Sequence, residues 1–164
     1  MEYSGTPART RAPDVLKALS RPTTTSPVIL LAEDSEDDAY FFQRALRRTG
    51  LPHTLKRARN GKLAVEALKE AIEAPEAGVL PHIIFLDLKM PIMGGFDVLE
   101  WIRSSPASGR SSVVVLSGSD EAADRAKASE LGAHSYLVKP ITESQLREQL
   151  QKIFVGENSP GAPA

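Results

Sequence analysis

The chain has 164 residues, a formal net charge of -1, and a composition that is 41% hydrophobic and 25% charged. This balance is typical of a soluble globular protein and offers no bulk electrostatic attraction to nucleic acid or to an anionic membrane. The absence of cysteine excludes disulfides, thiolate chemistry and cysteine-based zinc sites. No apolar run approaches the roughly 20 residues of a membrane span, and no signal-peptide pattern is present. We therefore expect a cytoplasmic protein that binds neither nucleic acid nor membrane.

Composition divides the chain into one folded unit and two tails. Residues 1–26 are rich in Pro, Thr, Ser and Arg and poor in large apolar side chains, which predicts a disordered N-terminal arm. Residues 27–155 alternate apolar runs with helical patterns, and we expect one domain there. Residues 156–164 predict a disordered tail.

Five short segments predict β-strands. Four are the continuous apolar runs of buried strands, whereas the segment His53–Ala58 is more polar and suits the edge of a sheet. The buried strands are expected at Val28–Ala32, Ile83–Leu86, Val113–Leu116 and Tyr136–Val138.

Helical periodicity fills the gaps between these strands. The segment Asp120–Leu131 is mostly alanine and charge and predicts a weakly amphipathic helix, and Thr142 and Gln145 have capping-box spacing at the start of the last helix. Strands that alternate with helices predict an α/β fold with a doubly wound, five-stranded parallel sheet. Such sheets bind ligands at the carboxyl ends of their strands.

Polar residues stand where each buried strand ends. They are Glu33 and Asp34, then Asp87, Ser117 and Lys139. Because the carboxyl ends of parallel strands lie along one edge, we expect these side chains to meet.

Together, these side chains suit the transfer of a phosphoryl group. Two carboxylates about 5 Å apart repel by roughly 3 kcal/mol at an effective dielectric of 20, so a proton or a cation is needed among them. An open, all-oxygen site suits Mg²⁺. Lys139 supplies a positive charge and Ser117 a hydroxyl donor, which together can stabilise a phosphoryl group in transfer. Asp87 is then the candidate nucleophile, forming an acyl phosphate.

Residues 36–38 and Ser117 also have simpler structural interpretations, and a calcium-binding loop can be excluded. Residues 36–38 are acidic in the first turn of a helix, which favours a role in capping and solvation. Ser117 and Asp120 have capping-box spacing, so Ser117 is also a candidate cap for the next helix. A calcium loop that starts at Asp34 would need Gly and Glu where Ala39 and Ala45 stand.

Four segments together resemble the receiver domain of bacterial two-component response regulators. They are "LLAEDSEDD", "IIFLDLKMPIMGG", "VVVLSGSDEAAD" and "LGAHSYLVKP", in the order and spacing of that family, and the resemblance extends from about Val28 to Val155. It implies a flavodoxin-like fold with strand order 2-1-3-4-5. It also implies a regulator that signals through phosphorylation-dependent protein–protein interaction and is not a conventional enzyme. Because the segment after Val155 is too short for an output domain, we expect a stand-alone regulator.

The resemblance gives each acid a role. Asp87 is similar to the aspartate that accepts a phosphoryl group from a histidine kinase, and Asp34 to the direct Mg²⁺ ligand. Glu33 corresponds to the neighbouring acid that acts on Mg²⁺ through water, and the backbone carbonyl of Lys89 to a further ligand. Lys89 also occupies a position that tunes phosphoryl lifetime in the family.

The other site residues correspond to the parts that sense the phosphoryl group. Lys139 is similar to the lysine that pairs with phosphoryl oxygens, and Ser117 to the hydroxyl residue of the switch. Tyr136 is similar to the aromatic switch residue, and the Lys139–Pro140 bond is cis in this family. A switch formed by Ser117 and Tyr136 would change the 120–131 helix, the fifth strand and the last helix, where we expect a homodimer or partner surface.

The link "IEAPEAGVLPH", with "LDLKMP" and "SYLVKP", resembles single-domain regulators partnered with bacterial phytochromes. This implies a sensor histidine kinase of the phytochrome type as partner.

Three other functions compete with this interpretation. The first is a pseudo-receiver that binds partners without taking phosphate, although such proteins usually lose one of the site residues. The second is a phosphatase of the haloacid dehalogenase kind, which needs a second Asp where Lys89 stands. The third is a flavin binder, which would need a Ser/Thr-rich loop where Glu33 and Asp34 stand.

Overall fold

A computed structural model describes residues 26–75 and 79–156. Within these residues, five strands alternate with five helices. The strands are β1 (Val28–Ala32), β2 (Thr54–Ala58), β3 (Ile83–Asp87), β4 (Ser112–Ser117) and β5 (Ser135–Val138). The helices are α2 (Glu36–Arg48), α3 (Gly61–Glu73), α4 (Gly95–Ser104), α5 (Ala122–Glu130) and α6 (Glu143–Gly156). The predicted arm, apart from Ser26, and the predicted tail, apart from Gly156, lie outside the described residues.

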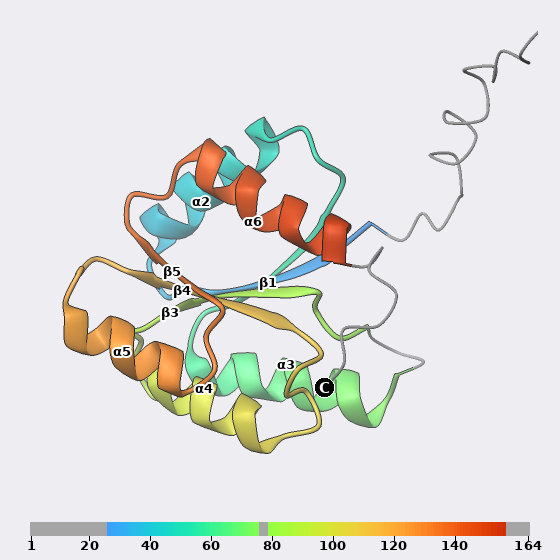
Figure 1. The fold of residues 1–164 in the computed structure, drawn as a ribbon. Helices are drawn as coiled ribbons and strands as arrows, with labels where there is room; N and C mark the ends of the chain where they lie inside the picture. The colour runs from blue at the N-terminus through green and yellow to red at the C-terminus, as the bar shows by residue number, and fades with distance from the viewer. Residues whose placement is uncertain (1–25, 76–78, 157–164) are drawn as a thin grey trace, which may run out of the picture.

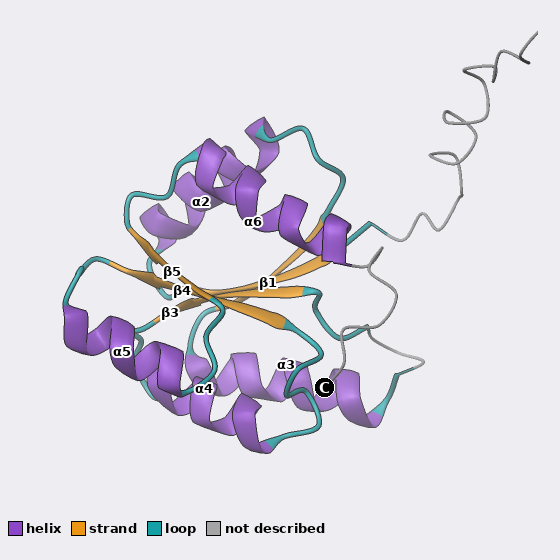
Figure 2. Ribbon diagram, viewed as in Figure 1, coloured by secondary structure: helices purple, strands orange, loops and turns teal. Residues whose placement is uncertain are grey.

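The strands form one parallel sheet in the order β2-β1-β3-β4-β5, which confirms the predicted fold. Helices α2 and α6 cover one face of the sheet, and α3, α4 and α5 cover the other (Figures 1 and 2). The crossover between β1 and β3 places the polar ends of these two strands side by side.

Two apolar layers, one on each face, hold the sheet between its helices. Successive side chains of a strand point to opposite faces. In β1, Leu30 therefore joins the cluster under α3 and α4, whereas Leu31 joins the cluster under α2 and α6. Phe85 of β3 packs edge-on against Phe42 of α2, with ring centroids 4.9 Å apart. Both faces are buried along β1, β3 and β4, which explains why these strands are continuous apolar runs. The apolar run at Tyr136–Val138 also predicted a buried strand, but β5 lies at the edge of the sheet and is only half-buried.

The structure corrects one expectation about helix capping. Helix α5 begins only at Ala122, and its N-cap residue is Glu121, so Ser117 does not cap it. Ser117 is instead the last residue of β4, where its hydroxyl accepts a hydrogen bond from the Ser119 amide at 3.1 Å.

Two other local expectations are confirmed. At the start of α6, the amide of Thr142 donates to Gln145 at 3.0 Å and the amide of Gln145 donates to the Thr142 hydroxyl at 3.3 Å, as a capping box requires. The Lys139–Pro140 bond is cis. Among the described residues, none of the helices is both long and apolar enough to span a membrane.

Gly95 allows helix α4 to start directly against the end of β3. A Cβ atom at Gly95 would lie 2.4 Å from the backbone oxygen of Asp87 and 2.8 Å from Cα of Leu88. No larger residue fits without moving the backbone that carries Asp87.

Candidate functional site

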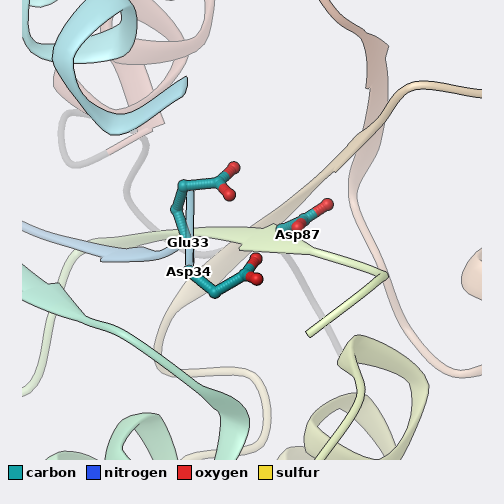
Figure 3. A group of neighbouring side chains, drawn as sticks. All are labelled: Glu33, Asp34 and Asp87. Carbon is teal, nitrogen blue, oxygen red and sulfur yellow. The ribbon is translucent and has the colours of Figure 1, made fainter. Parts of the chain in front are cut away.

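Three carboxylates meet where β1 and β3 end. One oxygen atom from each of Glu33, Asp34 and Asp87 can be chosen so that all three lie within 4.8 Å of one another. Glu33 is 1% exposed and Asp87 is 5% exposed, whereas Asp34 is open to solvent. Figure 3 shows the carboxylates of Glu33 and Asp34 turned toward the side on which Asp87 lies. The structure thus brings together the acids that the strand-end pattern singled out.

Asp87 is the acid whose charge is least favoured. Burial, and then the nearby charge of Glu33, raise its pKa from 3.8 to about 6, although the ammonium of Lys139 and the backbone amide of Lys89 act in the opposite direction. The carboxyl group therefore carries an electrostatic penalty when it is ionised in the metal-free protein.

Lys139 joins the acids from the end of β5. Its Nζ atom lies 2.7 Å from Glu33 Oε2, 2.8 Å from Asp38 Oδ2 and 3.4 Å from Asp87 Oδ1. Burial alone would lower the pKa of Lys139, but the hydrogen bonds to Asp38 and Glu33 and the charges of Asp87 and Glu33 together raise it above its ordinary value. The lysine is therefore a fixed positive charge at the site.

The contact with Asp38 corrects the interpretation of the acids at positions 36–38. These were expected to cap the helix and face solvent, but the Asp38 side chain reaches Lys139. Hydrogen bonds at the start of α2 hold the backbone of Asp38 close to Glu33 and so to the site. The Ser35 hydroxyl caps α2 by accepting from the Asp38 amide at 3.2 Å, and Glu33 Oε1 accepts from the Ser35 amide at 3.0 Å.

Arg57 was missed in the sequence, although it holds the acidic loop in place. It lies on the edge strand β2, beside Leu31 of β1. Its guanidinium donates to the backbone carbonyls of Glu33, Asp34 and Ser35, at 3.1, 3.3 and 3.3 Å, and to the Glu36 carboxylate at 2.8 Å. A planar group with five donors can bind several acceptors at once, which lysine cannot do in the same way.

Ser117 and Tyr136 are connected through Ser119. Ser117 is buried at the end of β4, next to β5. The Tyr136 hydroxyl donates to the Ser119 carbonyl at 2.8 Å, and the guanidinium carbon of Arg125 lies 4.6 Å from the centre of its ring. Residues 117–119 thus connect the end of β4 to Tyr136.

The acidic group has the donor chemistry of a hard divalent cation. Carboxylate oxygens are the ligands that Mg²⁺ prefers, and an exposed ligand such as Asp34 leaves coordination positions for water. A cation there would also favour the ionised form of Asp87, whose pKa is raised by burial and then by the charge of Glu33. The residues present therefore fit Mg²⁺.

Comparison with known proteins adds an independent observation. A profile of the response regulator receiver domain family matches residues 29–151. Response regulator Rcp1 of Synechocystis is 35% identical over 126 residues, which cover 77% of this chain and 85% of Rcp1.

Solved structures agree with the sequence match. A Mn²⁺-bound form of Rcp1 aligns with a TM-score of 0.65 and 31% identity, covering 84% of this chain and 99% of that one. The phosphorylated cyanobacterial phytochrome response regulator RcpA aligns with a TM-score of 0.67 and 31% identity, covering 82% and 97%. The bacteriophytochrome response regulator AtBRR aligns with a TM-score of 0.68 and 29% identity, covering 85% and 97%. The chain therefore belongs to the response regulator receiver domain family and is related to the phytochrome response regulators.

Proposed function

We propose that this chain is a stand-alone, cytoplasmic response regulator that accepts a phosphoryl group on Asp87 from a sensor histidine kinase. The observation that carries the proposal is the placement of Asp87: a buried carboxylate at the end of the central strand, beside two other acids and one lysine. The chain covers 85% or more of Rcp1, RcpA and AtBRR, which supports a regulator built on the receiver alone.

The chemistry assigned to Asp87 is a phosphoryl transfer. An Asp87 oxygen attacks the phosphorus of phosphohistidine, a P–O bond forms, and the P–N bond breaks as histidine leaves with that electron pair. The new group adds negative charge beside Glu33 and Asp34, and the ammonium of Lys139 is placed to offset part of it.

The same acids are the proposed Mg²⁺ site. Asp34 and Asp87 would bind the ion directly, with Glu33 acting through water and the backbone carbonyl of Lys89 as a further ligand. When bound, Mg²⁺ supplies positive charge for the phosphoryl oxygens. The group of carboxylate oxygens within 4.8 Å supports this assignment.

Output is proposed to pass through contact with another protein. The Ser117 hydroxyl would turn to a phosphoryl oxygen on Asp87, and the movement would reach Tyr136 through residues 117–119. The hydrogen bond between Tyr136 and the Ser119 carbonyl supports this route. The surface that would change is formed by α5, β5 and α6, and we propose it as the homodimer or partner interface.

The proposed partner upstream is a histidine kinase of the phytochrome type. This rests on the relation to RcpA, a cyanobacterial phytochrome response regulator, and to AtBRR, a bacteriophytochrome response regulator. Phosphotransfer from a purified phytochrome kinase, compared with a kinase of another sensor class, tests the assignment. Equal transfer from both would contradict it.

Intact-mass measurement tests the central claim. The protein is incubated with acetyl phosphate and Mg²⁺, and we expect one added phosphoryl group in the wild type and none in Asp87→Asn. Full incorporation in Asp87→Asn would show that the acceptor lies elsewhere. No incorporation in the folded wild type would favour a pseudo-receiver.

Two further measurements test the output and the domain bounds. Sedimentation with and without beryllium fluoride, a phosphoryl mimic, should show association that Tyr136→Ala weakens. We also propose that residues 1–26 are dispensable for phosphorylation, so a chain that starts near Ser26 should take up phosphate like the full chain. A collapse of its stability would show that residues 1–25 support the domain.

A further inference from the structure

Lys139 is bound more closely to Glu33 and Asp38 than to Asp87. Its Nζ atom is 2.7 Å from Glu33 and 2.8 Å from Asp38, which are the distances of charge-assisted hydrogen bonds. The 3.4 Å separation from Asp87 is too long for a good hydrogen bond. The ammonium therefore forms its short hydrogen bonds with two acids other than the proposed phosphoacceptor.

The two close partners differ in how easily they can release the lysine. The Glu33 side chain is 2% exposed, so that carboxylate has little access to water in place of Lys139. The Asp38 side chain is 44% exposed, and water can replace the lysine there at low cost.

A pocket beside Asp38 leaves room for its side chain to turn away from Lys139. A pocket of about 80 Å³ is lined by Asp38, Lys139 and Glu33 together with apolar residues of α2 and of the loop before α6. Lys139 and Asp38 are thus not fully enclosed by packed neighbours on this side.

We propose that Asp38 is a positioning residue that holds Lys139 away from Asp87 and thereby slows phosphoryl uptake. The inference rests on the proposed function, in which Asp87 accepts the phosphoryl group. As that group arrives, Lys139 keeps Glu33 and exchanges Asp38 for a phosphoryl oxygen, and the Asp38 carboxylate turns to water. The negative charge of Asp38 also opposes the incoming phosphoryl group, so both effects have the same sign.

Acetyl phosphate gives a reaction in which this restraint can be measured without a kinase. An Asp87 oxygen attacks phosphorus, the bond between phosphorus and the acetyl oxygen breaks, and acetate leaves with its electron pair. A second measurement avoids bond formation: the affinity for beryllium fluoride in the presence of Mg²⁺ reports how well the site accepts a phosphoryl-like ligand.

The test compares Asp38→Asn with Asp37→Asn. Both variants remove one carboxylate from the first turn of α2, so they change net charge and the helix N-terminus alike. Asparagine keeps the size of Asp38 and an acceptor oxygen but not its charge. We expect Asp38→Asn to take up phosphate about threefold faster than Asp37→Asn, and to bind beryllium fluoride about threefold more tightly, the range of a partly exposed ion pair. Asp37→Asn should behave like the wild type.

A second pair of variants shows whether the effect passes through Lys139. In a Lys139→Met background, the difference between Asp38→Asn and Asp37→Asn should shrink to the part that comes from direct repulsion between Asp38 and the phosphoryl group, because no ammonium remains to be released. A difference of the same size in that background would overturn the role assigned to Lys139. The single variants decide the sign of the effect even if Lys139→Met does not fold.

The remaining outcomes are equally decisive. Equal rates and affinities in Asp38→Asn and Asp37→Asn would overturn the inference and leave the proposed function intact. Slower uptake in Asp38→Asn would show that Asp38 assists the lysine, the reverse of the proposal. A folded wild type that takes up no phosphate would refute both the proposed function and the inference.

Discussion

Replacing Asp87 with asparagine should stabilise the metal-free protein at neutral pH. The acid is 5% exposed, and burial together with the charge of Glu33 raises its pKa from 3.8 to about 6. Asparagine has nearly the same shape and cannot ionise, so the variant avoids the penalty of a buried charge.

The sign and size of the effect follow from proton linkage. Well below pH 3.8, the carboxyl group is protonated in both the folded and unfolded states, and ionisation favours neither. As the pH rises toward about 6, the unfolded state releases its proton first, so the wild type loses free energy of unfolding. A shift of about two pKa units corresponds to about 3 kcal/mol. Relaxation of water at the open side of the site reduces this, and we expect a gain of about 2 kcal/mol for Asp87→Asn at pH above about 6.

Urea unfolding in the presence of a chelator measures this gain. The single tryptophan, Trp101 in α4, provides the fluorescence signal. The difference in unfolding free energy between Asp87→Asn and wild type should grow from near zero in acid to its full value at neutral pH. Asp37→Asn, which removes an exposed carboxylate, is the control. A difference that does not change with pH, or a variant less stable than wild type at neutral pH, would refute the electrostatic reasoning. Added Mg²⁺ should stabilise the wild type more than Asp87→Asn.

Three further substitutions test the parts that support the site. Asp34→Ala should weaken Mg²⁺ binding at least about tenfold by calorimetry without destabilising the metal-free protein, because it removes a ligand and also a repulsive charge. Gly95→Ala should cost about 2 kcal/mol or more in urea unfolding, since its Cβ would lie 2.4 Å from a backbone oxygen, whereas Gly94→Ala, with a nearest distance of 3.4 Å, should change stability little. Arg57→Gln should weaken Mg²⁺ binding several-fold and cost about 1 to 2 kcal/mol, because it frees three backbone carbonyls of the acidic loop. The more exposed Arg59 is its control, and equal effects at the two positions would contradict the role of Arg57.

The fold could be predicted because its signals are local and repeat along the chain. Buried parallel strands need apolar residues on both faces, and the four apolar runs each became a strand with bounds shifted by no more than one residue. The polar edge strand was found one residue too early, at His53 rather than Thr54. Capping was less predictable. The spacing of Thr142 and Gln145 formed a capping box, but the same spacing at Ser117 and Asp120 did not.

The site residues at strand ends were predictable for a topological reason. A parallel sheet brings the ends of its strands to one edge, so Glu33, Asp87 and Lys139 needed no knowledge of side-chain geometry to be grouped. Arg57 and Asp38 were not found in this way. An arginine on a polar edge strand and an acid in the first turn of a helix both have ordinary explanations in sequence, and only the positions of neighbouring elements show what their side chains contact.

The distribution of charge makes Asp87 the least compensated acid of the site. The ammonium of Lys139 contacts three acids of the site, and its two shortest contacts are with Glu33 and Asp38. The charge of Glu33, the most buried acid, is thereby offset by the lysine, and the charge of exposed Asp34 can be solvated by water. Asp87 is left buried with only the longest of the three contacts to the lysine. The least compensated carboxylate gains most when positive charge arrives. A cation bound at this edge should therefore lower the pKa of Asp87 and stabilise the ionised oxygen that the proposed phosphoryl transfer requires.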